Sequence, residues 1–435
     1  MVRIGTLPMR LLALRYGADI VYTEELIDWK FLRSKRRVND VLGTVDYVDQ
    51  SDGTIVFRTC SLEKGKVVLQ IGTCDPERAL KVGQLVQDDV AAIDVNMGCP
   101  KEFSIKGGMG VALLGKPEKA KAILSTLVQG LKIPVSCKIR ILSTTEDTVN
   151  LVKEFAGTGI SAIGIHGRTR DERPQHKVHP DVIRAVAREV SIAVIANGGS
   201  KEIESYEDIE KFKLSCGTSS VMIARAAEWN CSIFRKEGLL DMDDVIKEYL
   251  KLAIEYDNSP SNTKYCIQNI LRELQDTPRG RKFLDCQTLE QICSIWDMGE
   301  YCREKQKEYR IAGIQGRWQV DPSNLEPSNK KCKISENEEK YENLIEMKVA
   351  FLRANFPADT DLPKCKLHVW AQKQNLDLPT YDTRREDKLF RTILTFMGKS
   401  YTSSYWEKNK RFAEQGAALV CLCALGLIEK SILID

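Results

Sequence analysis

The first 236 residues repeat one pattern, in which a short run of β-branched and apolar residues is followed by a helical stretch. The helical stretches commonly begin with Pro or a capping Thr, as at 117–131 and 145–155. This alternation predicts βαβ units and a parallel sheet. Around seven strands favour a (β/α)8 barrel over an open sheet. The seven expected strands are residues 19–22, 67–71, 92–96, 134–139, 162–166, 193–197 and 220–224.

A turn at residues 63–65 separates the run 54–60 from the run 67–71 and suggests an inserted hairpin. After the barrel segment the β-branched runs stop, and amphipathic stretches predict a small helical domain. Pro322, Pro327 and a charged, Asn- and Ser-containing run then predict a flexible linker. The last segment is predicted to have the order α-β-β-β-α, with helices over 363–374 and 408–427. The expected domains are residues 1–236 (barrel), 237–311 (helical), 312–341 (linker) and 342–430.

The surplus of positive over negative charge is concentrated near the C-terminus of the chain. The net charge is only +3, yet residues 346–428 hold 13 Lys and Arg against 9 Asp and Glu. A nucleic-acid contact is therefore expected in that segment. Fourteen cysteines without a CxxC pair, and four histidines, argue against a metal site and for a reducing compartment. The longest apolar run, 416–428, is too short to cross a bilayer, so we expect no membrane insertion and a cytoplasmic location, with association to the endoplasmic reticulum left open.

Polar residues follow the expected strands where the catalytic groups of a barrel are found, at the carboxyl ends. A single Cys is usually a buried small hydrophobe, and a lone His is usually structural. The functional interpretation therefore rests on the location that these residues share. The Asn-Gly-Gly sequence could be a simple turn, but in a late barrel loop it would expose N–H groups to a phosphate. These residues are Asn96, Cys99, Lys138, Arg140, His166, Arg168, Asn197, Gly198, Gly199, Ala224 and Arg225.

Four motifs make the pattern specific: residues 96–100 (Asn-Met-Gly-Cys-Pro), 106–114, 137–140 and 166–170. They resemble the motifs of tRNA-dihydrouridine synthases, with similar spacing throughout residues 1–310. The C-terminal segment resembles a double-stranded-RNA-binding domain. The resemblance implies an FMN enzyme that uses NADPH to reduce the C5–C6 double bond of a tRNA D-loop uridine, which we expect at position 20. The uridine would have to leave the base stack to reach the flavin.

The same resemblance implies roles for single residues. Cys99 would give a proton to C5 of the uracil after hydride passes from flavin N5 to C6. An ordinary thiol is largely protonated at neutral pH, which suits a general acid. Cofactor contacts are expected from Gln70, Lys138 and His166 at the ring, from Asn197, Gly198, Gly199, Ala224 and Arg225 at the phosphate, and from the backbone of Met1, Val2 and Arg3. RNA contacts are expected from Asn96, Arg140, Arg168, Lys348, Arg353, Lys408, Lys410 and Arg411.

Three departures from the family pattern affect these expectations. Glu414 stands where an RNA-binding domain usually has Lys, and Val369 stands where its first helix often has a polar contact. The alternative interpretation of residues 408–411, the less favoured one, is a solvated helix end. The family has a strand ending in Ala-Pro-Met, and this chain starts at the Met, so we expect a barrel lacking its first strand, lower stability and weaker FMN binding.

Two alternative functions remain open from the sequence. One is another FMN barrel oxidoreductase with a small-molecule substrate, against which the C-terminal RNA-binding pattern argues. The other is a non-catalytic tRNA- or double-stranded-RNA-binding or regulatory protein, in which the barrel without its first strand acts as a scaffold. We expect a monomer in each case.

Overall fold

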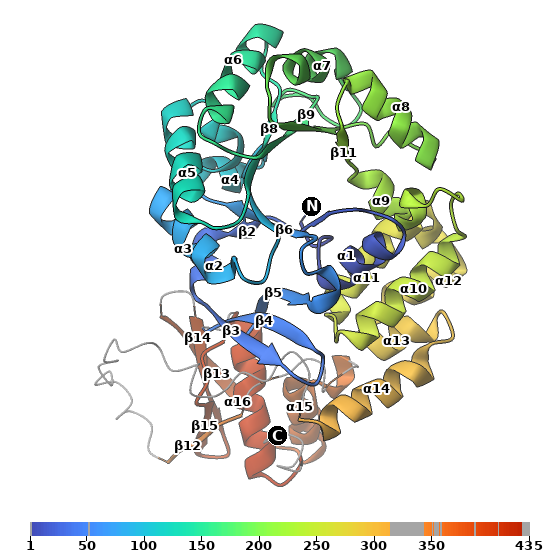
Figure 1. Ribbon diagram of the computed structural model, residues 1–435. Helices are drawn as coiled ribbons and strands as arrows, with labels where there is room; N and C mark the ends of the chain where they lie inside the picture. The colour runs from blue at the N-terminus through green and yellow to red at the C-terminus, as the bar shows by residue number, and fades with distance from the viewer. Residues whose placement is uncertain are drawn as a thin grey trace. The chain divides into compact units, whose positions relative to one another are not determined.

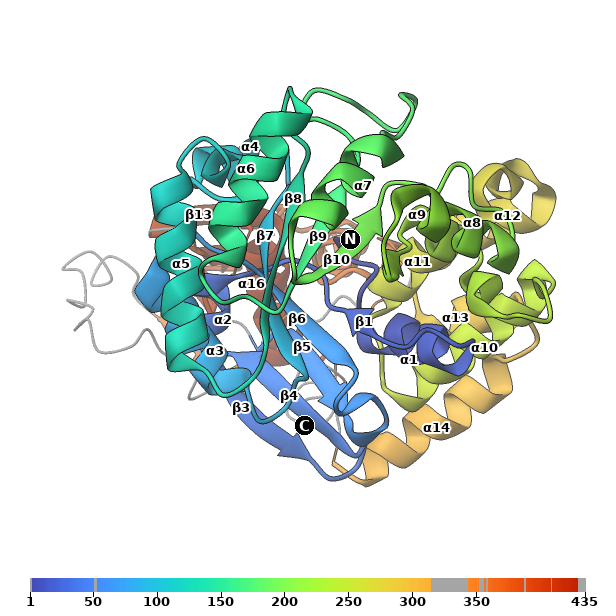
Figure 2. The same ribbon diagram turned by 45° about the horizontal axis from the view of Figure 1, so that its top comes forward.

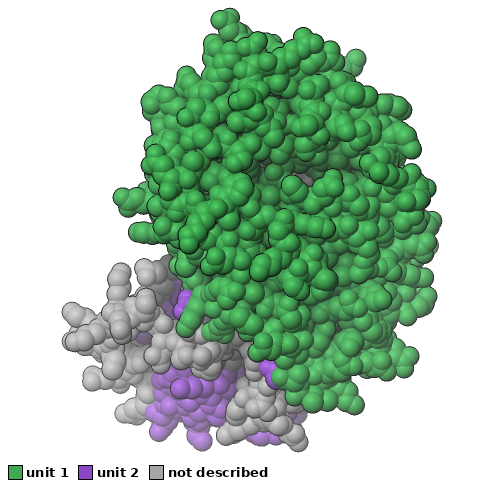
Figure 3. Space-filling view, viewed as in Figure 1, with its two compact units in different colours: residues 1–49, 54–312 green, residues 50–53, 313–435 purple. Residues whose placement is uncertain are grey.

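The computed structural model describes residues 2–50, 53–313, 343–349, 351, 356, 359–386, 389–407 and 409–428. It divides into two compact units, residues 1–49 with 54–312 and residues 50–53 with 313–435 (Figure 3). Both sides of the predicted boundary at residues 236 and 237 lie in the first unit. The predicted linker, residues 312–341, lies outside the described residues except for its first two positions.

The first unit is built on a curved parallel sheet whose strands follow one another in sequence order (Figure 1). At one edge, β1 (Val21–Tyr22) and β2 (Leu26–Ile27) both pair with the next strand, Val21 opposite Val67 and Ile27 opposite Gly72. They are therefore two pieces of one interrupted edge strand. The remaining strands are β6 (Val67–Gly72), β7 (Ala92–Met97), β8 (Val135–Arg140), β9 (Ala162–His166), β10 (Ala193–Asn197) and β11 (Ser220–Met222).

The parallel sheet is a barrel wall with one opening. In the described part of the chain, no ladder joins β11 to β1, so these two strands are the edges of the sheet. A first barrel strand would stand between them. The predicted (β/α)8 architecture without its first strand is confirmed. Apolar side chains of the central strands, such as Leu69, Val95 and Ile163, are fully buried and form the core of the unit.

Helices cover the outer side of the sheet, as Figures 1 and 2 show for α5 to α8. Their starts follow local signals: the Asp75 side chain caps α3, the Thr144 side chain caps α6, and Ser205 with Asp208 forms a capping box at α8. The helices are α1 (Leu7–Arg15), α2 (Asp28–Leu32), α3 (Pro76–Val86), α4 (Glu102–Lys106), α5 (Pro117–Gly130), α6 (Thr145–Ala156), α7 (Pro180–Glu189), α8 (Tyr206–Cys216) and α9 (Arg225–Trp229).

The predicted hairpin between residues 54–60 and 67–71 is wrong. The first of these runs is β5 (Ile55–Cys60), which joins β3 (Ser34–Asn39) and β4 (Thr44–Asp49) in a separate antiparallel sheet. The second is β6 of the parallel sheet. The separate sheet has its own aromatic contacts, since the Tyr47 ring lies 5.7 Å from Phe57 and 4.9 Å from Phe31.

The predicted helical segment continues the core of the barrel. Its buried side chains, among them Val245, Tyr249 and Ile267, belong to the same apolar cluster as the strands. The Arg58 guanidinium of β5 also donates to the Tyr256 carbonyl, with an N···O distance of 2.6 Å. The helices are α10 (Met242–Glu255), α11 (Pro260–Leu271), α12 (Pro278–Asp285), α13 (Leu289–Ser294) and α14 (Gly299–Ile311). No helix within the described ranges is long and apolar enough to span a bilayer.

The second unit has the predicted α-β-β-β-α order, with one further strand. Its elements are β12 (Leu344–Met347), α15 (Pro363–Lys373), β13 (Thr380–Glu386), β14 (Leu389–Phe396), β15 (Lys399–Ser403) and α16 (Lys410–Ala424). The three predicted strands form an antiparallel meander, and β12 pairs in parallel with β15. Buried residues of α16, such as Ala417 and Leu419, pack in one cluster with Leu367 of α15 and Leu394 of β14.

A strand fused to the N-terminus should stabilise the first unit. An alternating apolar strand ending in Ala-Pro would pair with the open edges of β1 and β11 and bury their unpaired backbone groups. We expect the melting temperature, measured by differential scanning calorimetry, to rise by about 5 °C or more. The control is a Gly/Ser extension of the same length, which should leave the melting temperature unchanged. Equal melting of both extended chains would contradict this prediction.

Candidate active site

The strand register brings the predicted polar residues to one edge of the sheet. Asn96 of β7 lies opposite Lys138 of β8, and Arg140 lies opposite His166 of β9. His166 in turn lies opposite Asn197 of β10. Because all carboxyl ends of a parallel sheet meet at the same edge, these side chains share one end of the barrel.

A buried carboxylate inside β7 organises the residues near this edge. Asp94 accepts hydrogen bonds from Gln70 Nε2 at 2.8 Å and from Ser136 Oγ at 2.7 Å. Burial raises the pKa of the Asp94 carboxyl to about 6, against these two donors, which act in the opposite direction. The remaining oxygen of the Gln70 amide accepts from Asn96 Nδ2 at 3.1 Å. Asp94 thus fixes the orientation of Gln70, and Gln70 fixes that of Asn96.

The loop after β7 holds Cys99 in place. The Asn96 side-chain oxygen accepts the N–H groups of Gly98 and Cys99, both at 3.0 Å, and Arg140 Nε donates to the Gly98 carbonyl at 2.9 Å. Gly110, with φ of +58°, passes so close that a Cβ there would lie 2.5 Å from the Cys99 carbonyl oxygen. Burial raises the pKa of the Cys99 thiol, so the thiol is protonated at neutral pH.

Lys138 provides a cation with no partner of its own. Among the described residues, no carboxylate or carbonyl oxygen pairs with its ammonium group. Burial lowers the pKa of Lys138 to about 8, although Asp94 nearby acts in the opposite direction. The ammonium therefore still carries its charge for most of the time at neutral pH. A buried, unpaired cation is costly, which makes it a good receptor for an anionic ligand.

His166 is neutral, and Arg168 supports the loop beside it. Burial, together with the positive charges of Lys138 and Arg140, lowers the pKa of His166 to about 2. Arg168 is only 2% exposed. Its Nη1 donates to the Gly198 carbonyl at 2.7 Å and its Nε to the His176 carbonyl at 2.9 Å. The structure therefore places the Arg168 guanidinium beneath the glycine loop.

The loop after β10 forms a close-fitting backbone turn. Gly198 has φ of +120°, and a Cβ there would lie 2.8 Å from the His166 ring. A Cβ on Gly199 would lie 2.8 Å from the Phe212 ring. Asn197 Nδ2 donates to the Met222 carbonyl at 2.8 Å, which ties this turn to β11.

Ala224 and Arg225 follow β11, and within the described residues the Arg225 guanidinium has no hydrogen-bond or ion-pair partner. The backbone N–H groups of the turn after β10, which has no side chain at Gly198 or Gly199, and the Arg225 cation suit a phosphate group.

The other predicted site residues belong to the first three positions of the chain or to the second unit, and some of them lie outside the described residues. Met1 lies outside the described residues. Val2 is exposed, and Arg3 donates its backbone N–H to Glu24 Oε2 at 2.7 Å. In the second unit, Lys348, Lys410 and Arg411 are exposed. Arg353 and Lys408 lie outside the described residues. Three residues at the barrel edge were not predicted from sequence, namely Asp94, Ser136 and Glu25.

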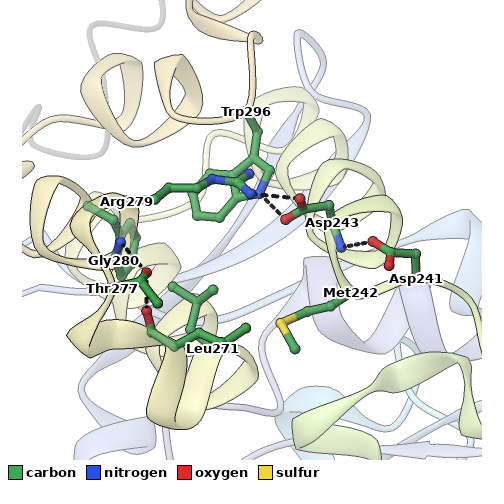
Figure 4. A pocket seen from close by; sticks show the side chains of 10 residues that line it. Asp241, Met242, Asp243, Leu271, Thr277, Arg279, Gly280 and Trp296 are labelled. Carbon is green, nitrogen blue, oxygen red and sulfur yellow. Dashed lines mark hydrogen bonds and ion pairs between the residues drawn. The ribbon is translucent and has the colours of Figure 1, made fainter.

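A separate cavity of about 250 Å³ lies in the helical segment (Figure 4). Two carboxylates line it: Asp243 accepts from Trp296 Nε1 at 2.9 Å and from Arg279 Nη1 at 2.7 Å, and Asp241 Oδ1 accepts the Asp243 N–H at 2.8 Å. The Arg279 guanidinium also lies over the Trp296 ring, 4.9 Å from its centroid. The polar groups of this cavity are thus used in its own wall. No group of three metal-ligating side chains occurs in the described part of the chain.

The fold and this edge define a (β/α)-barrel protein with a protonated thiol, a free lysine and a glycine turn at its strand ends. The dihydrouridine synthase family model matches residues 1–285, and the double-stranded RNA binding motif matches residues 363–425. The chain belongs to the dihydrouridine synthase family and carries a C-terminal double-stranded-RNA-binding domain.

Two yeast proteins are among its similar relatives. A tRNA-dihydrouridine(20) synthase [NAD(P)+] of Schizosaccharomyces pombe is 43% identical over 286 residues, which cover 62% of this chain and 58% of that protein. The protein of the same name in Saccharomyces cerevisiae is 36% identical over 289 residues, which cover 62% of this chain and 75% of that protein. A crystal structure of a tRNA-dihydrouridine(20) synthase dsRBD domain is 40% identical and covers 20% of this chain and 95% of that chain, with a TM-score of 0.20.

The neutral state of His166 can be tested by NMR. Because its folded pKa lies far below the ordinary value near 6.5, its imidazole signals should not shift between about pH 5 and 8. Unfolding would take up a proton at this site, so its contribution to stability is present above about pH 6.5 and is lost as the pH falls. The His166→Asn variant assigns the signal among the four histidines. A titration midpoint near 6.5 for His166 would contradict the prediction.

Proposed function

We propose that this protein is a tRNA-dihydrouridine synthase that uses FMN and NADPH to reduce the C5–C6 double bond of a tRNA D-loop uridine, at position 20. The observation that carries the proposal is the Cys99 thiol, held protonated in the loop after β7 at the strand edge that bears the unpaired Lys138 cation. The names of the two yeast relatives support the reaction, the tRNA position and the NAD(P)+ coupling.

The residues at the strand ends fit FMN. Lys138 would face the anionic edge of the flavin ring, and the Gln70 amide, oriented by Asp94, would hydrogen-bond to that ring. Gly198, Gly199 and Arg225 would hold the phosphate, because the turn leaves no room for a side chain at either glycine. Bound FMN, reduced by NADPH, would supply a hydride to C6 of the uracil.

Cys99 would complete the reduction. Addition of a hydride to C6 breaks the C5–C6 π bond and leaves an electron pair at C5, delocalised onto the C4 carbonyl. The S–H proton of Cys99 passes to C5, and the sulfur retains the bonding pair as a thiolate. The raised pKa of the thiol keeps the proton on sulfur until that moment. Lys138 and Arg140 then stabilise the negative charge that remains on the sulfur.

The second unit would hold the RNA. Recognition of double-stranded RNA depends mainly on helix shape and phosphate contacts. Lys410 and Arg411 are exposed at the start of α16, where they can meet phosphates. Glu414, one turn further along, forms ion pairs with Lys364 at 2.6 Å and with Lys410 at 3.8 Å. These pairs neutralise much of the charge of Glu414, so it need not repel a phosphate.

Replacing Cys99 by Ala tests the catalytic part of the proposal. The Cys99→Ala variant should keep bound flavin, because its thiol does not hold the cofactor, and should form dihydrouridine about 10²–10⁴-fold more slowly. The measurement is dihydrouridine in tRNA by mass spectrometry, beside the visible absorbance of the flavin. Cys74→Ala, two residues after the end of β6, is the matched control and should retain activity. Equal rates in Cys99→Ala and the wild type would remove Cys99 from the mechanism.

Salt dependence of tRNA binding tests the RNA contact. If Lys410 meets a phosphate, Lys410→Ala should weaken binding and reduce the slope of log K against log salt by about 1. Lys399→Ala removes the same charge at the start of β15, next to the turn between β14 and β15, and serves as the control. Identical slopes for the wild type and both variants would show that α16 does not bind the tRNA.

A further inference from the structure

Glu25 brings a second carboxylate to the strand ends. It lies between β1 and β2, immediately before Leu26, on the interrupted edge strand. Its neighbour Glu24 is engaged, because its carboxylate accepts the Arg3 N–H at 2.7 Å. Glu25 differs, since its Oε1 is buried and accepts no hydrogen bond in the described structure. A buried carboxylate oxygen without a donor is costly and calls for a functional explanation.

The backbone of β6 makes room for this carboxylate. Gly72 ends β6 opposite Ile27, and a Cβ on Gly72 would lie only 2.8 Å from Glu25 Oε1 and 3.2 Å from Glu25 Cγ. The absence of a side chain at Gly72 therefore lets the Glu25 side chain lie against the end of β6. The strand next to β6 is β7, and the loop that follows β7 carries Cys99.

The two acids influence each other. Burial raises the pKa of Glu25, and the nearby Cys99 thiol acts in the opposite direction. Burial also raises the pKa of Cys99, with Glu25 adding to the effect. Lys101 favours the ionised form of Glu25, and the Ser104 hydroxyl favours the thiolate. Lys138 and Arg140 face Cys99 from β8 and also favour the thiolate. The Glu25 carboxylate thus raises the pKa of Cys99, whereas the surrounding cations lower it.

We propose that Glu25 is a positioning residue for Cys99: its carboxylate accepts the S–H of the thiol and keeps the proton on sulfur, against Lys138 and Arg140, until the uracil takes it. The inference rests on the proposed function, because only a proton donor gains from a thiol kept neutral beside two cations. After each proton transfer the thiolate must regain a proton from water. The negative charge of Glu25 then favours that uptake.

The pH dependence of alkylation tests this proposal without tRNA, NADPH or turnover. Iodoacetamide reacts with the thiolate, so its rate at Cys99, measured by mass spectrometry of the peptide, reports the pKa of the thiol. The Glu25→Gln variant should shift the midpoint of this rate to lower pH and raise labelling near about pH 8 several-fold, up to about tenfold. Glu25→Asp keeps the charge and should restore much of the wild-type midpoint.

Two controls keep the test interpretable. Glu24→Gln removes the adjacent carboxylate that faces Arg3 and should leave the Cys99 midpoint unchanged. The fully buried Cys137 thiol should stay unlabelled in every folded variant and so reports folding in the same digest.

A second variant, at Gly72, tests the same contact while Glu25 itself is retained. Gly72→Ala places a methyl group 2.8 Å from Glu25 Oε1, displaces the carboxylate, and should also lower the Cys99 midpoint. An unchanged midpoint in Glu25→Gln or in Gly72→Ala, with Cys137 protected, would overturn the role of Glu25. A shifted midpoint in a protein that forms no dihydrouridine would instead support the Glu25–Cys99 contact and refute the proposed reaction.

Discussion

Asp94 is a carboxylate removed from water in the middle of a parallel sheet, and the arrangement of the candidate site depends on how it is satisfied. Gln70 and Ser136 donate to its two oxygens, Gln70 then accepts from Asn96, and Asn96 accepts the N–H groups of the Cys99 loop. Each bond fixes the orientation of the next group. A buried polar network of this kind is stable only when every member is paired, which gives the thiol one defined position.

Burial shifts the pKa values of the titratable groups at the site so that their uncharged forms are favoured. It raises the pKa of Cys99 and Glu25 and lowers the pKa of Lys138 and His166, so that the neutral forms are favoured. Lys138 nevertheless stays largely charged at neutral pH and, like Arg225, has no anionic partner among the described residues. A site with a protonated thiol and unpaired cations suits a reaction in which an anionic cofactor binds first and negative charge then develops on the substrate.

Sequence reasoning located the strands because their apolar, β-branched runs are continuous, and β9 and β10 agree with their predicted bounds. It assigned β5 to a false hairpin, since a turn signal does not tell which strand is the partner. It missed Asp94 because that residue lies inside a strand rather than at its end. Glu25 was missed because β1 and β2 have only two residues each, although Thr23, Glu24 and Glu25 directly follow an apolar pair.

The central claim is that the Cys99 thiol delivers the C5 proton. The most direct measurement mixes pre-reduced, flavin-loaded protein with tRNA and follows a single turnover in H2O and in D2O. We predict that the wild type slows in D2O and that Cys99→Ala slows by a factor on the order of 10²–10⁴, with flavin still bound. Equal single-turnover rates in the two proteins would contradict it.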